Sequence, residues 1–261
     1  MESYFNLNQV LASLSTEELA RLAPDLEEVT LQANQALFRY GDSVDYTYFP
    51  LTAVASLLSL LEGGKSVEIG LVGREGVLGV PTMLGSNSAT YTAEVLVPGQ
   101  AVRVRAEALR KYYAMNDPLC PQLIQQAWSL STQFSRLAVC NLCHHIPARV
   151  SRWLLMLQDR AAVDELHLTH EQIATRLGIR RSGVTVQLGQ LEEAGAIEAK
   201  RGRVRITDRS KLEEVSCECY RYLVAESAWA YLQPSAPMPS LRTPSQYWPR
   251  LIEHSKAVLY T

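Results

Sequence analysis

Seven basic side chains are concentrated between residues 172 and 206, and cationic side chains are the groups that pair with phosphate oxygens. The same stretch holds only three acidic residues, so its net charge is +4. Residues 1–120 carry eight Lys and Arg against fourteen Asp and Glu, a net charge of −6. An acidic first part followed by a short basic patch predicts one surface that faces a polyanion. The basic residues are Arg176, Arg180, Arg181, Lys200, Arg201, Arg203 and Arg205.

Residues 168–195 have the pattern of two short helices joined by a glycine. Thr169 and Gln172 have the spacing of a capping box, which predicts that a helix begins there. Gly178 allows a tight turn, and a second helix follows it. The apolar side of that second helix has spacings of four and three residues, at Val184, Leu188 and Leu191. This order is typical of a helix-turn-helix.

The opposite face of the second helix carries small side chains, which leave room for close approach to base edges. Arg181, at the start of this helix, can hold guanine O6 and N7 through two hydrogen bonds. The start of the first helix can bind phosphate through backbone amides and the helix dipole. The residues expected to contact DNA here are Thr169, His170, Arg180, Arg181, Ser182, Thr185 and Val186.

A basic hairpin is predicted directly after the two helices. Ile197, Val204 and Ile206 are spaced for two short strands around Arg201-Gly202. The side chains available to phosphates are Lys200, Arg201, Arg203 and Arg205. Alone, such a charge run is more typical of a solvated hairpin on an ordinary α+β domain. The order of helix, turn, helix and basic hairpin instead favours a winged helix-turn-helix.

The elements that must position this segment begin with a strand-rich region. From Glu28 to Arg105, short apolar runs are broken by turn residues, which is typical of a barrel or jelly roll. Within it, Val67, Ile69 and Leu71 alternate with other residues as in a half-buried strand. Before it, residues 5–23 predict short helical turns, with capping-box spacing from Ser15. The fold class is therefore predicted to be α+β, with an N-terminal β-roll.

A long helix is predicted after Pro118 and Pro121. Its apolar residues follow the a/d spacing by which two helices pair, and a polar Asn141 in such a seam can fix register. The alternative is a helix that lies on the core of its own domain. The predicted dimer seam is Leu123, Ala127, Leu130, Phe134, Leu137 and Asn141.

These patterns divide the chain into four parts: a β-roll (1–118), a dimerisation helix (119–145), a winged helix-turn-helix (146–232) and a Pro/Ser-rich tail (233–261). That the β-roll is an effector domain is implied by the resemblance described next. No segment has the pattern of a signal peptide, and charges interrupt every long apolar stretch, which predicts a cytoplasmic chain without membrane contact. No nucleophile–base, phosphate-loop or paired-carboxylate motif is recognisable, so an enzyme is not expected.

The segments LTHEQIATRLGIRRSGVT (168–185) and KRGRVRITD (200–208), with this domain order, resemble the cyclic-AMP receptor protein and fumarate–nitrate reduction regulator superfamily. The resemblance runs from about Asn6 to Tyr222. It implies a transcription regulator that binds a roughly palindromic site on double-stranded DNA as a homodimer, with half-sites about one helical turn apart. RNA polymerase is a further expected partner.

The sequence departs from that family where a cyclic nucleotide would bind. The family's cassette runs Gly-Glu-Leu-Gly and then Arg-Ser-Ala, with Glu accepting from a ribose hydroxyl and Arg pairing with the phosphate. Val77 stands in place of that Glu, and Asn87 in place of that Arg. Cyclic AMP is therefore not expected to be a tight ligand, and the effector stays unidentified. The corresponding pocket residues are Gly76, Val77, Leu78, Gly79, Asn87, Ser88 and Ala89.

Five cysteines offer a second sensing hypothesis. Cys140, Cys143 and His144 form a C-x-x-C-H string, the pattern of c-type haem attachment, and share a helix face that suits metal or thiol chemistry. Packed free thiols are the more common outcome, so no metal, haem or other cofactor is expected, and Cys217 and Cys219 are expected to be structural. No cysteine precedes Cys120, which disfavours the iron–sulfur branch of the family. The alternative function is a cyclic-nucleotide- or redox-sensing module that controls a partner protein, which the winged helix disfavours.

Overall fold

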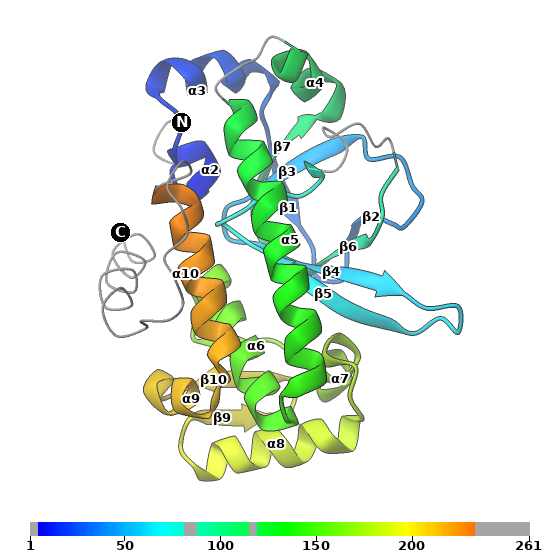
Figure 1. Cartoon of the computed structure of the whole chain (residues 1–261), viewed down its shortest axis with the longest axis vertical. Coiled ribbons are helices and arrows are strands. Elements are labelled where there is room, and N and C mark those ends of the chain that lie inside the picture. Colours follow the sequence, from blue (N-terminus) through cyan, green and yellow to red (C-terminus); the bar gives the residue numbers. More distant parts are fainter. Residues whose placement is uncertain (1–4, 81–87, 115–118, 233–261) are drawn as a thin grey trace.

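The computed structural model describes residues 5–80, 88–114 and 119–232 (Figure 1). The predicted tail, 233–261, and Asn87 lie outside the described residues. The chain begins with α2 (Gln9–Ala12), α3 (Thr16–Leu22) and the 3-10 turn η1 (Ala23–Asp25). The capping box predicted for α3 is confirmed, because the Ser15 hydroxyl accepts from the Glu18 amide and the Glu18 carboxylate accepts from the Ser15 amide.

The predicted β-roll is confirmed as two antiparallel sheets. One sheet has the strand order β1-β7-β3 and the other β2-β6-β4-β5. The strands are β1 (Glu27–Leu31), β2 (Ala36–Phe38), β3 (Tyr46–Pro50), β4 (Val54–Leu60), β5 (Ser66–Val72), β6 (Thr92–Val97) and β7 (Gly99–Arg105). A short helix, α4 (Ala106–Ala114), follows the last strand. Residues of the two sheets meet in a core that includes Leu31 and Tyr48 of the first sheet and Leu57 and Val95 of the second.

Two helices run side by side along the molecule. The long helix α5 (Leu119–Cys143) lies along the β-roll, and the last described helix, α10 (Glu218–Leu232), runs back beside it (Figure 1). Arg136 on α5 joins the pair, because its guanidinium lies 3.0 Å from the Glu226 carboxylate and 4.3 Å from the centre of the Tyr222 ring. Helix α5 is therefore covered on one side by strands and on another by α10.

The C-terminal part forms the predicted winged helix-turn-helix. It begins with α6 (Ile146–Ala161) and contains a small sheet of strand order β8-β10-β9. Its other elements are β8 (Glu165–Leu166), α7 (His170–Leu177), α8 (Arg181–Glu193), β9 (Ile197–Lys200), β10 (Arg203–Ile206) and α9 (Arg209–Val215). Among the described residues, no helix is both long and apolar enough to cross a membrane.

One continuous core joins the β-roll to the winged helix. Trp153 of α6 is fully buried in an apolar cluster that also contains Val54 and Leu71 of the β-roll. The Trp153 indole donates to the Glu68 carboxylate at 2.8 Å, and the Ser56 hydroxyl donates to the same carboxylate at 2.6 Å. Burial raises the pKa of Glu68 to about 7, although these hydrogen bonds oppose the shift.

The prediction of which side of β5 is buried is therefore only partly right. Val67 and Ile69 were predicted to be on the buried face, yet both are half-buried, while Glu68 is only 6% exposed. The physical reason is that β5 is covered from more than one side, by α5, α6 and α7. Alternation of apolar residues describes a strand with one solvated face, and this strand has none.

Candidate nucleic-acid interface

Local sequence fixes the turn between α7 and α8. The Thr169 hydroxyl accepts from the Gln172 amide at 3.2 Å, and the Gln172 side chain accepts from the Thr169 amide at 2.9 Å. Gly178 ends α7 with φ of +63°, a left-handed conformation that favours glycine. Val184 and Leu188 on the inner side of α8 are 0% and 1% exposed, so the predicted apolar face is buried as expected.

The outer side of α8 is open. Arg181, Ser182 and Thr185 are exposed, and Val186 is 55% exposed. Arg180 precedes the helix at its N-cap position and is also exposed. Figure 1 shows α8 lying across one end of the molecule, with this side uncovered. The structure thus brings these five predicted contact residues onto one accessible helix face.

The start of α7 adjoins this face. Nδ1 of His170 lies 2.9 Å from Oγ1 of Thr185, and the Thr185 hydroxyl also donates to the Arg181 carbonyl at 3.2 Å. Thr169 is exposed at the N-cap of α7. These contacts place the N-terminus of the first helix beside the recognition face, where a phosphate could meet backbone amides.

The wing carries its basic side chains outward. Strands β9 and β10 pair in antiparallel register around Gly202, whose φ of +74° favours glycine. Glu198 pairs with Lys200 at 2.6 Å, and Glu165 lies 3.6 Å from Arg203. Such exposed pairs contribute at most about 1 kcal/mol, so both cations can exchange these partners for phosphates. The exposed basic residues of the wing are Lys200, Arg201, Arg203 and Arg205.

Arg176 does not belong to the exposed basic patch. Its side chain is 5% exposed and forms an ion pair with Glu94 of β6. Beside it, the Gln172 side chain donates to the Asn34 side chain at 3.2 Å. Helix α7 is thereby docked on the β-roll, a contact that charge counting along the sequence does not detect. An Arg on the apolar side of a short helix was the available signal, since such a cation needs a buried partner.

The residues that match the cyclic-nucleotide cassette are largely core residues here. Val77 is 0% exposed and packs in a cluster with Leu11 and Phe49. Gly79 has a φ of +93°, and a Cβ at this position would lie 3.1 Å from the Tyr46 carbonyl oxygen. Ser88 is exposed and Ala89 is buried. Gly79 therefore has a left-handed backbone conformation close to β3, where any larger side chain would be strained and crowded.

Aromatic side chains fill the space between this part of the β-roll and α5. The ring centres of Phe38 and Tyr91 are 5.9 Å apart, and those of Tyr91 and Phe134 are 6.1 Å apart. Burial raises the pKa of the Tyr91 phenol to about 12. A Cβ at Gly70 would lie 2.9 Å from the Phe134 ring, so strand and helix are in close contact.

The predicted dimer seam lies on the inner side of α5. Leu123, Leu130 and Leu137 are 3%, 7% and 4% exposed and pack in three apolar clusters of this same chain. Phe134 packs against the β-roll, and Ala127 is half-buried. For these side chains the structure matches the alternative interpretation, a helix that lies on the core of its own domain, because they are already buried against other parts of the same chain. Asn141 is half-buried.

A second stripe with the same spacing lies one residue further along α5 and faces solvent. Ile124, Trp128 and Leu142 are 50%, 37% and 88% exposed. Serines and an alanine between them leave room for a second backbone to approach. The whole stripe is Ile124, Trp128, Ser131, Ser135, Ala138 and Leu142. A seam for a partner helix therefore fits these residues better than the buried leucines.

An open recognition face, a basic wing and a β-roll with a long helix together define a DNA-binding regulator of the winged-helix class. Comparison with known proteins agrees with this class. Residues 28–116 match the cyclic nucleotide-binding domain family, and residues 148–215 match the Crp-like helix-turn-helix domain family. The chain belongs to the Crp/Fnr superfamily of transcription regulators.

The individual relatives have low sequence identity to this chain, but each match covers nearly the whole length of the relative. The global nitrogen regulator of Nostoc sp. is 24% identical over 210 residues, which cover 76% of this chain and 93% of the relative. The CRP-like cAMP-activated global transcriptional regulator of Mycobacterium tuberculosis is 21% identical over 78% of this chain and 94% of its own length. The structure of FixK2 from Bradyrhizobium japonicum has a TM-score of 0.64 at 17% identity and covers 74% of this chain and 98% of FixK2.

Proposed function

We propose that this transcription regulator binds a roughly palindromic DNA site as a homodimer and contacts RNA polymerase there. The observation that carries the proposal is the exposed outer side of α8 together with the exposed basic wing that follows it, represented by Arg181 and Arg203. Two such surfaces related by a two-fold axis fit half-sites about one helical turn apart. We expect the protein to act by binding rather than by catalysis, and to do so in the cytoplasm.

The exposed stripe on α5 supports the homodimer. An isologous interface places the same patch of both copies together, and apolar residues at a/d spacing provide the contact area. Leu142, which is 88% exposed, gains a partner in this arrangement. The alternative function, a module that controls a partner protein through sensing alone, leaves the recognition face and the basic wing unexplained.

Substitution of Arg181 and of Arg203 should separate two kinds of DNA contact. Arg181→Ala is expected to lower discrimination at one base pair of each half-site by about 1–3 kcal/mol, because a bidentate base contact is lost. Arg203→Ala is expected to weaken all sequences alike and to reduce the salt slope of binding by about one, because a phosphate contact is lost. Binding-site selection with purified protein, followed by gel shifts at several salt concentrations, measures both effects.

Lys65→Ala is the matched control for these substitutions. Lys65 is exposed in the turn between β4 and β5, away from α8 and the wing, so its loss should change neither quantity. Equal weakening of every sequence by Arg181→Ala and Arg203→Ala would contradict the assignment of the recognition face. Absence of any specific protection in footprinting, including on the protein's own upstream region, would contradict the function.

We further propose that cyclic AMP is not the effector. Two charged anchors are replaced by Val77 and Asn87, and each charge-assisted contact commonly contributes about 1.5–3 kcal/mol, so their loss weakens binding roughly a hundredfold or more. Calorimetric titration of the full chain with cyclic AMP should show no saturation in the micromolar range. A submicromolar dissociation constant would overturn this proposal.

A further inference from the structure

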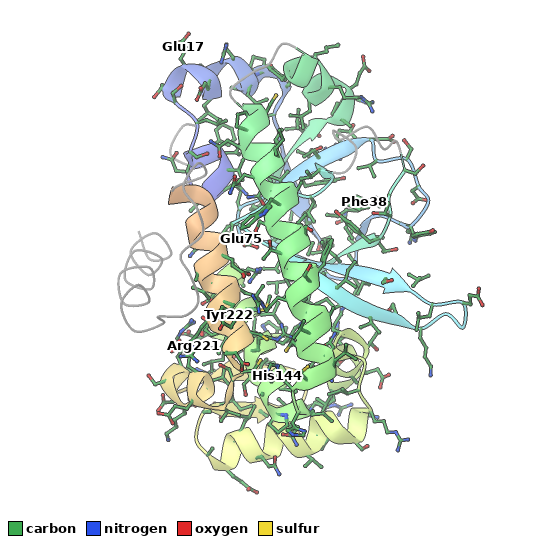
Figure 2. The ribbon with its side chains drawn as sticks, in the orientation of Figure 1. Glu17, Phe38, Glu75, His144, Arg221 and Tyr222 are labelled. Atoms are coloured by element: carbon green, nitrogen blue, oxygen red, sulfur yellow. The ribbon has the colours of Figure 1, made fainter. Side chains whose placement is uncertain are left out.

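Four side chains of types that can ligate a metal ion, from two parts of the chain far apart in sequence, meet at the junction of α5, α6 and α10. Cys140 lies in the last turn of α5, His144 follows the end of that helix, and Cys217 and Cys219 flank the start of α10. The three sulfurs and one imidazole nitrogen all lie within 4.8 Å of one another. Figure 2 shows His144 at the lower end of α5, beside the beginning of α10. None of these cysteines forms a disulfide.

The distances suit a single tetrahedral ion. Sγ of Cys140 lies 3.5 Å from Sγ of Cys217, and Sγ of Cys219 lies 3.6 Å from Nδ1 of His144. With zinc–sulfur bonds of about 2.3 Å and zinc–nitrogen bonds of about 2.0 Å, tetrahedral geometry separates two sulfurs by about 3.8 Å and a sulfur from a nitrogen by about 3.5 Å. The ligands of an iron–sulfur cluster bind different iron atoms and must stand further apart. Spacing therefore favours one ion over a cluster.

The imidazole is held in the orientation that zinc ligation requires. Nε2 of His144 lies 3.2 Å from the Glu218 carboxylate, while Nδ1 faces the sulfur of Cys219. A carboxylate on the far ring nitrogen fixes the tautomer, so that the near nitrogen presents its lone pair to the ion. The backbone amide of His144 donates to the Cys140 carbonyl at 3.1 Å, which keeps both ligands on one face of a helical turn.

The surroundings also distinguish these thiols from ordinary core residues. Cys140, Cys217 and Cys219 are 0%, 6% and 2% exposed and form a small cluster of their own, against which only Ala148 packs among the described apolar residues. The buried Arg152 has a favourable electrostatic interaction with the Cys140 thiolate. A buried cation beside three thiols matches the negative charge of a zinc ion with three thiolates.

We propose that Cys140, His144, Cys217 and Cys219 bind one zinc ion, which fastens the end of α5 to the start of α10. Binding replaces three S–H protons, which leave to solvent, and uses the neutral imidazole of His144. Cys143 is exposed and is not among the ligands, so the C-x-x-C-H string does not act as a unit. The absence of a metal was the expectation from sequence, where Cys217 and Cys219 could not be placed near Cys140.

Such an ion would brace the connection through which the winged helix is attached. The segment from His144 to Ile146 joins α5 to α6, and α10 closes the C-terminal part against α5. The site therefore goes beyond DNA binding, because it would fix the position of the recognition surface relative to the long helix. Its existence can be tested without any DNA.

Metal analysis of the full chain, purified under reducing conditions, is the first test. We expect about one zinc ion per chain, as in other closed sites with four protein ligands. Cys217→Ser and Cys140→Ser should lower the zinc content at least tenfold, whereas Cys219→His, which keeps a ligand atom, should retain more zinc than Cys219→Ser. The matched control is Cys143→Ser, which removes an exposed thiol outside the site and should leave the zinc content unchanged.

Titration of the reduced, metal-free chain with Co²⁺ gives a second measurement. It uses the native sequence and so does not depend on whether a substituted chain folds. Tetrahedral thiolate coordination should give intense visible absorption that saturates at one ion and is displaced by zinc. Glu218→Gln, which weakens the hold on His144, should lower zinc affinity about 10- to 100-fold in competition with a chromophoric chelator. Three results would each overturn the proposal: no zinc and no Co²⁺ absorption, iron with acid-labile sulfide, or loss of the ion in Cys143→Ser.

Discussion

Replacing Ile124 and Leu142 together by glutamate should convert the protein to a monomer and lower its affinity for a full palindromic site by about 10²–10⁴-fold. Both side chains are at least half exposed and lie on the outward stripe of α5. In an isologous helix pair each glutamate lies near its own copy, so apolar contact is lost and like charges repel. A monomer also loses the gain in affinity that comes from two linked half-sites. Light scattering and gel shifts on full and half sites measure the two effects.

The choice of positions distinguishes the outward stripe from the inner one. Leu130→Glu would bury a charge in the chain's own core and report on folding rather than on pairing. Leu61→Glu is the matched control, because Leu61 is 56% exposed in the turn after β4 and should leave the dimer intact. A folded double variant that remains a dimer with unchanged affinity for the full site would refute the outward seam.

Glu68→Gln should remove a pH dependence of stability of about 3 kcal/mol. The pKa of Glu68 is about 7 in the folded chain against an ordinary value of 4.5, and each unit of difference corresponds to about 1.4 kcal/mol. The folded state therefore holds a proton between these two values that the unfolded state has released. The stabilisation by this proton is fully present below pH 4.5 and is lost as pH rises to 7.

The measurement compares the variant with the native chain on both sides of this window. The amide side chain introduced by Glu68→Gln stays neutral, so the free energy of unfolding of the variant should rise relative to the native chain by about 3 kcal/mol between about pH 4 and pH 8. Denaturant titrations at several pH values give this difference. Glu62→Gln changes an exposed carboxyl of the same sheet edge and should follow the native curve. Parallel curves for Glu68→Gln and the native chain would contradict a carboxyl that is protonated when folded.

Glu68 also takes part in joining the β-roll to the winged helix. Glu68 accepts from Trp153, and Arg176 of α7 pairs with Glu94 of the neighbouring region of the β-roll. Ionisation of Glu68 therefore places a buried negative charge in a contact that holds the winged helix on the β-roll. No run of sequence around Glu68 shows this, because a single acidic residue in an apolar strand is equally consistent with an exposed position.

What the sequence predicts well is governed by interactions between near neighbours. The capping box of Thr169 and Gln172, the left-handed Gly178 and the turn at Gly202 involve residues within a few positions of one another. Such contacts have few alternatives, so spacing alone identifies the helix pair and its wing. The same holds for the departure at Val77, where the lost carboxylate is visible in the sequence itself.

Tertiary structure was needed wherever two faces of one element had the same pattern. On α5, the stripe that contains Leu130 and the stripe that contains Trp128 have identical spacing and differ by one residue. Spacing defines a stripe but not what covers it. Only the packing of the β-roll against α5 shows that the leucine stripe is buried in the chain's own core.

The amino-acid sequence by itself determined the domain order, the recognition helix and the basic wing, because each rests on local hydrogen bonds and helical or strand periodicity. Only the tertiary structure decided the outward face of α5, the burial of Glu68 and the meeting of Cys140 with Cys217. Those two cysteines are 77 positions apart, and their encounter depends on how α10 returns along α5. Contacts of that separation are set by the packing of whole elements, which no local pattern specifies.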